Sequence, residues 1–297
     1  MTRTMELESV VAADPALRFE PLTGSLGAIV HGVRLSGDLS PAVVAGLTEA
    51  LHRHRVLFFR DQHHLDDEGQ EAFAALMGEP EPHPIAPLKS ETRATWAVDS
   101  ADGIRANSWH TDVTFIPDIP YASILRAAVL PEIGGDTMWA DTCAAYRSLP
   151  ANLKAFADAS RGIHTNVFDS GLRPTDTKIG KTGYRAIPHF CDHPVVHVVP
   201  ETGERALLLG HFFRYFVGMP LGYSEPIFAL LQSHITRPEH TVRWRWAGGD
   251  VAMWDNRSTQ HYGVNDYVER RVLNRVSLRG TATVGIDGRQ GFACTVE

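Results

Sequence analysis

Cysteine is scarce in this chain of 297 residues, which contains only Cys143, Cys191 and Cys294. These three are odd in number, lie far apart and include no C-x-x-C pair. A disulfide framework and a thiolate zinc site are therefore excluded. Such sparing use of cysteine is typical of a reducing compartment, so we expect a cytoplasmic protein.

Long hydrophobic runs are missing as well. Residues 1–17 contain no apolar stretch of the length that a secretion signal or a membrane span requires. Positive charge is also in short supply, because 35 acidic residues outweigh 28 basic ones and leave a formal net charge of −7. Nucleic-acid binding needs a positive surface, so we expect neither nucleic acid nor a membrane as a partner.

Internal repeats, low-complexity stretches and linkers are absent too, so residues 1–297 are predicted to form one domain. Past residue 109, short apolar runs alternate with turns, and helical segments at roughly 144–159 and 224–236 interrupt them. This pattern predicts a mainly β fold with flanking helices, an α+β arrangement around a jelly-roll, cupin-like barrel.

Two segments lack the periodicity of a helix or a strand. Residues 80–108 are rich in proline and polar side chains and are long for a loop in a compact domain, so we expect a lid there. Residues 169–188 are predicted to be an irregular insertion. Ahead of both, Ser40-Pro41 combines an N-cap residue with a proline at the first helical position and predicts the start of a helix.

What the chain does contain is a pattern of metal ligands in two halves. The first half is the run W-H-T-D-V-T-F over residues 109–115, and the second is W-D-N-R-S-T-Q-H over residues 254–261. On a β-strand, His110 and Asp112 would project from the same face, and His261 would add a second imidazole. Two histidines and one carboxylate form the facial triad that suits non-haem Fe(II) and leaves coordination positions open for oxygen chemistry.

The sequence resembles the taurine/alkylsulfate/phenoxyacetate branch of the Fe(II)/2-oxoglutarate-dependent dioxygenases. The matching segments follow one another in the family's order, close to its spacing, over most of the chain. The resemblance implies a double-stranded β-helix, Fe(II) as the metal, and 2-oxoglutarate and O2 as cosubstrates. The matching segments are residues 109–115, Gly134-Gly135-Asp136-Thr137-Met138-Trp139, His193-Pro194-Val195-Val196, and Trp254 through His261 to Arg275.

The family pattern implies a role for each of these residues. It assigns iron to His110, Asp112 and His261, and it assigns a hydrogen bond to 2-oxoglutarate to Thr137. It pairs Arg275 with the distal carboxylate of the cosubstrate, which suits the planar fork of a guanidinium. Related halogenases replace the carboxylate ligand with a small residue, so an intact Asp112 favours oxygenation over halogenation.

Arg271 lies four residues before Arg275, and a bend or bulge is expected between the two. Its role stays open between the cosubstrate carboxylate and an anionic group on the prime substrate. In the family, both arginines lie one residue farther from the distal histidine, which suggests a one-residue deletion near residues 266–269. Trp254 resembles a residue that packs near the cosubstrate, although a core position explains it equally well.

The substrate is indicated by fewer residues. His83 matches the position at which sulfonate and sulfate users of the family hold their anion, and the backbone N–H of Val113 can contribute to the same contact. Ala86 stands where taurine users have a tyrosine, so taurine is not expected. Phe213, together with Phe168 and Phe212, is a candidate for an apolar wall of the pocket, or else for the core.

We therefore expect a small anionic substrate, an alkyl sulfate or a longer sulfonate, that is oxidised at the carbon bearing the group. Release of sulfate or sulfite would leave an aldehyde. Hydroxylation or desaturation of a specialised metabolite or an amino-acid derivative is the alternative. Two further alternatives are a metal-dependent hydrolase or lyase on a cupin-like barrel and a non-catalytic metal-binding barrel. Neither would need both Arg275 and Thr137, the two residues assigned to 2-oxoglutarate. Relatives are often dimers or tetramers, so a homo-oligomer is expected.

Overall fold

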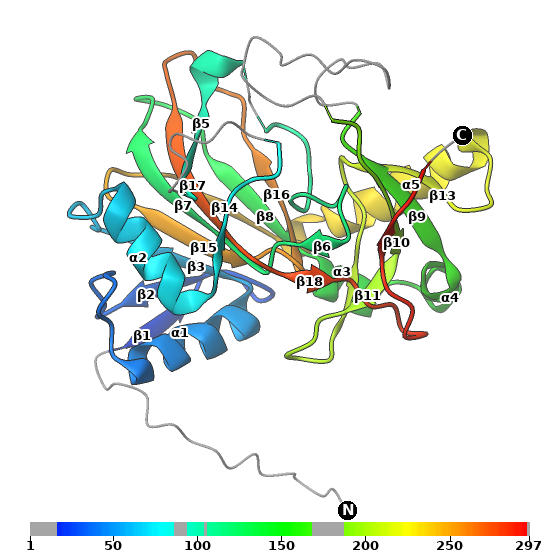
Figure 1. The fold of residues 1–297 in the computed structure, drawn as a ribbon, viewed down its shortest axis with the longest axis horizontal. Coiled ribbons are helices and arrows are strands. Elements are labelled where there is room, and N and C mark those ends of the chain that lie inside the picture. The colour runs from blue at the N-terminus through cyan, green and yellow to red at the C-terminus, as the bar shows by residue number, and fades with distance from the viewer. Residues whose placement is uncertain (1–16, 86–93, 104–105, 168–186, 296–297) are drawn as a thin grey trace, which may run out of the picture.

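The computed structural model describes residues 17–85, 94–103, 106–167 and 187–295. Its framework consists of two β-sheets that face each other (Figure 1). The smaller one has three strands in the order β14 (Thr241–Trp244), β8 (Thr137–Asp141) and β16 (Thr259–Gly263). The larger one has eight, in the order β1 (Arg18–Pro21), β2 (Ala28–His31), β3 (Val56–Phe59), β15 (Val251–Asp255), β7 (Ala122–Val129), β17 (Val272–Leu278) and β4 (Pro80–Glu81), with β5 (Trp96–Asp99) paired to β17.

Aromatic side chains fill the space between the two sheets. Phe58 of β3 stacks on Trp244 of β14 with ring centroids 4.1 Å apart, and Trp139 of β8 meets Trp254 of β15 edge to face at 5.7 Å. Large rings in such pairs bury much apolar area and fix the spacing of the sheets. The predicted jelly-roll-like barrel is confirmed, and its inner face is where β8, β16 and β17 carry the candidate site.

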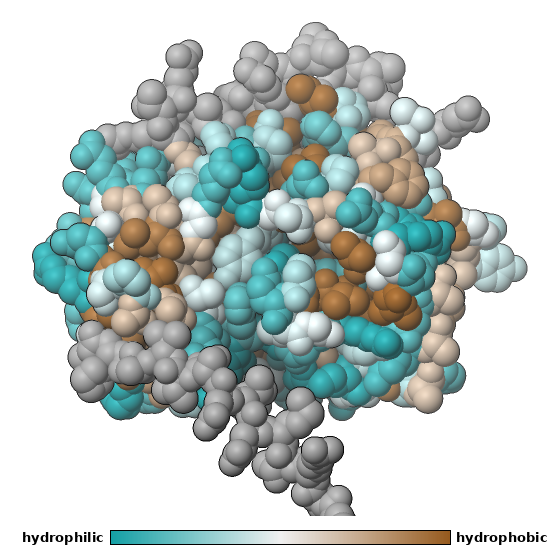
Figure 2. All heavy atoms as spheres, turned by 60° about the horizontal axis from the view of Figure 1, so that its bottom comes forward, coloured by the Kyte–Doolittle hydropathy of each residue, from teal (hydrophilic) through white to brown (hydrophobic). Residues whose placement is uncertain are grey.

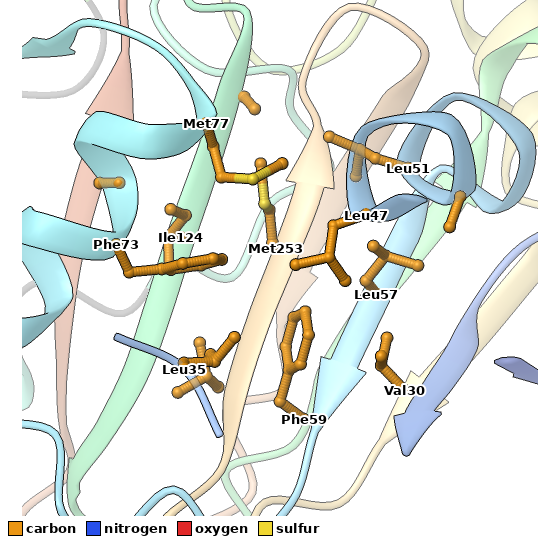
Figure 3. Close-up of a cluster of buried hydrophobic side chains, with 14 of the residues drawn as sticks. Val30, Leu35, Leu47, Leu51, Leu57, Phe59, Phe73, Met77, Ile124 and Met253 are labelled. Atoms are coloured by element: carbon orange, nitrogen blue, oxygen red, sulfur yellow. The ribbon is translucent and has the colours of Figure 1, made fainter. Parts of the chain in front are cut away.

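Two helices cover the outer face of the large sheet (Figures 1 and 3). The first is α1 (Pro41–His54), which begins at the predicted N-cap Ser40, and the second is α2 (Asp67–Met77), capped by Asp66. Their apolar stripes bury against the sheet, because helix positions three and four residues apart share one face. Figure 3 shows this core, with Leu47 and Leu51 from α1, Phe73 and Met77 from α2, and Phe59, Ile124 and Met253 from the strands.

A second group of elements lies at the other end of the molecule (Figure 1). It contains a four-stranded sheet and three further helices, whose apolar side chains form a separate core. The sheet has the order β13 (Phe213–Phe216), β9 (Arg161–Thr165), β10 (Phe190–Pro194) and β19 (Phe292–Ala293), and the helices are α3 (Thr142–Ser148), α4 (Ala151–Ala159) and α5 (Leu221–Ile235). The remaining short elements are β6 (Asp118–Ile119), β11 (Val196–Val198), β12 (Arg205–Leu207), β18 (Thr281–Ala282), η1 (Ser100–Asp102) and η2 (Pro238–His240).

Two sequence expectations about these elements were wrong in part. The single helix expected over 144–159 is two helices, α3 and α4, because Leu149 precedes Pro150 and takes an extended conformation (ψ 140°). The segment 80–108, expected as one loop, contributes β4 and β5 to the edge of the large sheet. The rest of the expected lid, residues 86–93 and 104–105, and most of the expected insertion, residues 168–186, lie outside the described residues.

On the face of the molecule that Figure 2 shows, hydrophilic and hydrophobic residues are interspersed, with the apolar ones in small groups. Among the helices of the described residues, none has the length and apolar character needed to cross a membrane.

Candidate metal centre

Three side chains predicted as metal ligands meet between the sheets. Nε2 of His110 and Nε2 of His261 each lie 3.6 Å from Oδ1 of Asp112, and one ligand atom from each residue lies within 4.8 Å of the others. All three residues are buried. His261 belongs to β16, and its backbone exchanges two hydrogen bonds, of 3.0 and 2.8 Å, with that of His110. The two halves of the sequence pattern are thus joined directly.

The near half of this centre is not the β-strand expected from the sequence. His110 forms only isolated bridges, to Gly210 and His261, and residues 112–115 form a turn. Val113 in this turn has φ 59°, a left-handed conformation that β-branched residues rarely adopt. Asp112 therefore reaches the two imidazoles because the chain turns, and strand alternation is not the cause.

The protonation of the three groups suits a divalent cation. Burial lowers the pKa of His110 and holds the pKa of His261 well below its usual range, so both imidazoles are neutral. Burial alone would raise the pKa of Asp112, but the positive charge of Arg275 outweighs burial and keeps that pKa far below its ordinary value. Neutral imidazoles and an ionised carboxylate are the forms that bind metal.

The hydrogen bonds of His110 also point its free nitrogen at the centre. Its Nδ1–H donates to the backbone oxygen of Ser108 over 2.7 Å, which leaves the lone pair on Nε2 facing Asp112. Two imidazole nitrogens and one carboxylate oxygen on one side of a position is the ligand set that non-haem Fe(II) takes. The residues present therefore fit the metal that the sequence resemblance implies.

Arg275 on β17 is paired with the metal-ligand candidate itself. Its Nη1 donates to Oδ1 of Asp112 over 2.8 Å, its Nη2 contacts Oδ2 of the same carboxylate, and Nη2 also donates to Ser123 Oγ over 3.0 Å. The guanidinium lies 5.7 Å from the ring of Trp254. Its Nε is buried and has no hydrogen-bond partner in the described part of the chain. The charge of Arg275 is thus balanced by Asp112, with one donor left over.

Arg271, and not Arg275, contacts Thr137. Its Nη2 donates to Thr137 Oγ1 over 3.0 Å, and its Nε donates to the backbone oxygen of Gly135 over 2.8 Å. The expected bulge between the arginines is confirmed, since the register of β17 against β7 shifts at Val272/Leu273. Thr137 and Arg275, both assigned to 2-oxoglutarate from the sequence, form no hydrogen bond with each other among the described residues.

Arg271 is a buried cation whose charge is not matched by an acid. Its residue is 5% exposed, and in the described part of the chain it forms no ion pair with a carboxylate. Burial lowers the pKa of Arg271, and the neighbouring Tyr267 and Asp136 act in the opposite direction. A buried charge without a counter-charge is costly, so this position is suited to an anionic ligand.

The hydroxyl of Thr137 is oriented by two donors. Besides Arg271, the indole Nε1 of Trp246 donates to Thr137 Oγ1 over 2.9 Å. Indole and guanidinium groups can only donate, so the proton of the hydroxyl must point elsewhere, and no acceptor for it exists among the described residues. Thr137 can therefore donate to a carboxylate held by Arg271. Trp246 was not identified by sequence reasoning, because it has the pattern of an ordinary core residue.

The Gly134-Gly135 turn brings Arg271 to this position. Both glycines have positive φ, 82° and 72°, and a Cβ at Gly135 would come within 2.9 Å of Arg271 Cδ. The N–H of Gly135 donates to Oδ1 of Asp266 over 2.8 Å. Glycine is thus required here both by the backbone conformation and by the close approach of the arginine.

The residues proposed for the substrate are only partly brought together. His83 lies with its ring 4.9 Å from that of Trp96, which in turn lies 5.5 Å from the guanidinium of Arg275. Trp254 is fully buried in the core between the sheets, with its ring 4.8 Å from that of His261. Trp254 is therefore both a core residue and a neighbour of the metal centre, the two alternatives that the sequence left open.

Phe213 is not beside the metal centre. It packs on Phe228 and His164 in the core under α5, with ring distances of 5.1 and 5.6 Å. Its neighbour Phe212 takes the expected place, 6.1 Å from the ring of His110. Phe212 belongs to the turn before β13 and Phe213 is the first residue of that strand, and the two side chains belong to different apolar clusters. Phe168 and Ala86 lie outside the described residues.

A small apolar cluster adjoins the metal centre. Val113, next to Asp112, packs with Phe212, Phe115 and Ile85, separately from the other cores of the described residues. No hydrogen bond of the described residues uses the backbone N–H of Val113. One side of the metal centre therefore has an apolar surface. The polar groups near that side belong to Arg275 and His83.

Known proteins resemble this chain over nearly its whole length. Residues 18–277 match the model of the taurine catabolism dioxygenase TauD, TfdA family. An alpha-ketoglutarate-dependent sulfate ester dioxygenase from Pseudomonas putida is 47% identical over 96% of this chain and 97% of its own. An alkylsulfatase from Acinetobacter baylyi is 47% identical over 93% of this chain and 89% of its own. The crystal structure of a taurine dioxygenase from Burkholderia xenovorans superimposes with a TM-score of 0.81, at 39% identity, over 95% of this chain and 96% of that one.

Proposed function

The chain belongs to the taurine catabolism dioxygenase TauD, TfdA family, and we propose that it oxidises alkyl sulfates at the carbon that bears the sulfate group. It is a 2-oxoglutarate-dependent dioxygenase with Fe(II) as its metal and O2 as its second cosubstrate. When bound, the iron supplies the activation of O2 that couples decarboxylation of 2-oxoglutarate to oxidation of a C–H bond. The side chains of this protein supply binding, orientation and a site protected from water.

The main support for the proposed site is that only one of the two buried arginines forms an ion pair with a carboxylate. Arg275 is neutralised by Asp112, whereas Arg271 is buried without a carboxylate. Arg271 and Thr137 therefore form the place for the distal carboxylate of 2-oxoglutarate, with the guanidinium providing charge and the hydroxyl a directed proton. His110, Asp112 and His261 hold the iron.

The sulfate group of the substrate is assigned to the opposite side of the centre. The unpartnered Nε of Arg275, the N–H of Val113 and the ring of His83 are the donors near that side. The alkyl chain lies against Phe212 and Phe115, whose cluster adjoins Val113. This arrangement suits a substrate with a charged head and an apolar tail.

The products follow from the position of oxidation. Insertion of one oxygen atom of O2 into the C–H bond beside the sulfate gives a 1-hydroxyalkyl sulfate. This compound loses hydrogen sulfate as its C–O bond breaks, and the hydroxyl carbon becomes an aldehyde. The second oxygen atom of O2 enters succinate, and the former carboxyl group of 2-oxoglutarate leaves as CO2.

Alkyl sulfates are expected to stimulate succinate formation, with aldehyde and sulfate released in equal amounts. The measurement is made on Fe(II)-loaded protein with a series of alkyl sulfates of increasing chain length, alkyl sulfonates, phenoxyacetates and taurine. Taurine should be the poorer substrate, since its short polar chain leaves the apolar cluster unused. Succinate formation that no sulfate or sulfonate stimulates would refute the proposed substrate class, and dependence on a specialised metabolite would support the alternative.

The turn before β8 gives a second prediction, on cosubstrate binding. Gly135→Ala places a methyl group against Arg271 and should displace the guanidinium from Thr137. Loss of a hydrogen bond to a charged group is worth about 1.5–3 kcal/mol, so the KM for 2-oxoglutarate should rise roughly 10- to 100-fold.

Gly203→Ala is the matched control for this variant. Gly203 has a similar positive φ of 68°, but a Cβ there meets no atom within 4 Å. It should lose comparable stability through backbone strain and keep the KM of the wild type. If Gly135→Ala shows the same KM as the control, the turn does not position Arg271.

We also propose that the protein is a cytoplasmic homo-oligomer, either a dimer or a tetramer. The support for the location is that all three cysteines are free thiols. Light scattering on the purified chain tests the assembly, and a monomeric mass would refute it.

A further inference from the structure

The turn that carries Asp112 cannot be stable through its own backbone preferences. Val113 has φ 59°, and a left-handed conformation is unfavourable for a residue branched at Cβ. Such conformations persist only where the surrounding structure determines them. The groups that contact residues 112–115 from elsewhere in the fold therefore decide where the carboxylate of Asp112 lies.

Asn256 is one of these groups. It is fully buried, and its side chain contacts both peptide groups of Asp112. Oδ1 of Asn256 accepts the N–H of Asp112 over 2.9 Å, while Nδ2 donates to the backbone oxygens of Asp112 and Pro120, each over 3.2 Å. Because Asn256 directly follows β15 and lies five residues before His261, one segment supplies a metal ligand and also contacts the other half of the centre.

His193 of β10, in the four-stranded sheet, contacts the same turn. Its Nε2 lies 2.9 Å from the backbone oxygen of Thr114, and its Nδ1 lies 2.8 Å from Thr283 Oγ1. A carbonyl can only accept, so Nε2 carries the proton and Nδ1 accepts from the threonine. Burial lowers the pKa of His193 to about 3, which keeps the ring neutral and this tautomer fixed.

The cavity around this imidazole is closely fitted. A Cβ at Gly291 would come within 2.5 Å of His193 Nδ1 and 2.6 Å of Thr283 Oγ1. The hydroxyl of Thr114 is held as well, by Nδ1 of His164 over 2.9 Å. The ring of His193 therefore has one available position, and through it the carbonyl that follows Val113 is fixed.

We propose that Asn256 and His193 are positioning residues that hold the 112–115 turn so that Oδ1 of Asp112 faces Nε2 of both His110 and His261. Asn256 fixes the peptide groups on each side of Asp112, and His193 fixes the end of the turn. Without them, Val113 relaxes toward an ordinary backbone conformation and the carboxylate moves with it. The inference rests on the proposed role of Asp112 as a metal ligand.

The test is the affinity of the purified protein for Mn(II), followed by electron paramagnetic resonance in the absence of cosubstrate and substrate. His193→Leu removes the donor to Thr114, and Asn256→Leu leaves both peptide groups of Asp112 without a partner. Mutation of a residue that hydrogen-bonds a metal ligand typically lowers metal affinity by about 10- to 100-fold. We expect a loss in that range from each variant. His193→Gln, whose amide nitrogen can reach the Thr114 carbonyl, should recover most of the affinity.

His240→Leu is the matched control. His240 is also buried, and its ring likewise contacts one backbone oxygen, that of His234 at 3.0 Å, and one hydroxyl, that of Ser148 at 3.1 Å. It contacts no residue of the 112–115 turn. The control should lose stability in denaturant as His193→Leu does, but keep its Mn(II) affinity within about twofold, since the outer-partner effect is confined to groups that hold a ligand.

Each outcome decides the proposal. Wild-type Mn(II) affinity in His193→Leu or Asn256→Leu would overturn the role of that residue, because a purely structural role changes stability alone. If neither the wild type nor Asp112→Ala binds Mn(II), the result refutes the proposed metal site. It then says nothing against the positioning roles of Asn256 and His193. If His193→Leu does not fold, Thr283→Val removes only the hydrogen bond that fixes the tautomer. It should weaken Mn(II) binding severalfold, and an unchanged affinity would overturn the role of His193.

Discussion

The His110→Ala variant is expected to bind Fe(II) more than about 100-fold more weakly than the wild type and to form no succinate above background. The loss of a ligand must exceed the 10- to 100-fold that outer partners of a ligand contribute. The variant removes a neutral group, so the ion pair between Arg275 and Asp112 stays in place. Anaerobic titration with Fe(II) measures the affinity, and succinate formation measures the turnover.

A neutral buried histidine elsewhere serves as the control for this experiment. His240→Ala, in η2 directly before the edge strand β14, should keep both the affinity and the turnover. Full iron affinity and turnover in His110→Ala would show that the three side chains gathered between the sheets are not the metal centre.

Arg271→Gln should raise the KM for 2-oxoglutarate by at least about 30-fold. Truncating one partner of a buried charge pair costs about 2–5 kcal/mol, because the carboxylate then lacks its counter-charge. In the absence of 2-oxoglutarate the same variant should be as stable as the wild type, or more stable, since a buried cation without a carboxylate has been removed. Arg271→Lys, which keeps the charge and loses the planar fork, should fall between the two.

Arg275→Gln is the natural comparison, since it is the other buried arginine of the site. It leaves Asp112 as an unpaired buried carboxylate, so the protein should lose about 3–5 kcal/mol of stability. The opposite pattern, a large change of KM in Arg275→Gln and none in Arg271→Gln, would show that the assignment made from the sequence is the correct one. Steady-state kinetics and denaturant unfolding on both variants separate these cases.

The sequence predicted those parts of the site that depend on residue type and short spacing. His110, Asp112 and His261 were identified because their types and flanking residues form a recognisable pattern, and the structure gathers them. The strand expected around His110 and Asp112 was wrong, since residues 112–115 form a turn, in which Asn256 hydrogen-bonds both peptide groups of Asp112. Asn256 lies about 140 residues from Asp112 in the sequence, so the run of residues 109–115 contains no local sign of this contact.

The arginines illustrate the same limit. Spacing placed Arg271 and Arg275 near the centre, but it could not show that Arg271, beyond the bulge at Val272/Leu273, is the one that reaches Thr137. Local rules were sufficient where a residue acts on its own neighbours, as with the cap of α1 at Ser40. They were not sufficient for β5, whose sequence lacks periodicity and which becomes a strand because β17 offers it an edge.

In the proposed function, the stability of the folded chain depends on the concentration of 2-oxoglutarate, because Arg271 is buried without a carboxylate partner until the cosubstrate supplies one. A ligand that binds only the folded chain stabilises it, by about 2.7 kcal/mol when its concentration is 100 times its dissociation constant. In the proposed function that ligand is 2-oxoglutarate. At concentrations well above its dissociation constant, fewer molecules of the protein should be open at any moment, and proteolysis of the open form should slow. Without it, this stabilisation is lost and Arg271 has no carboxylate partner among the described residues.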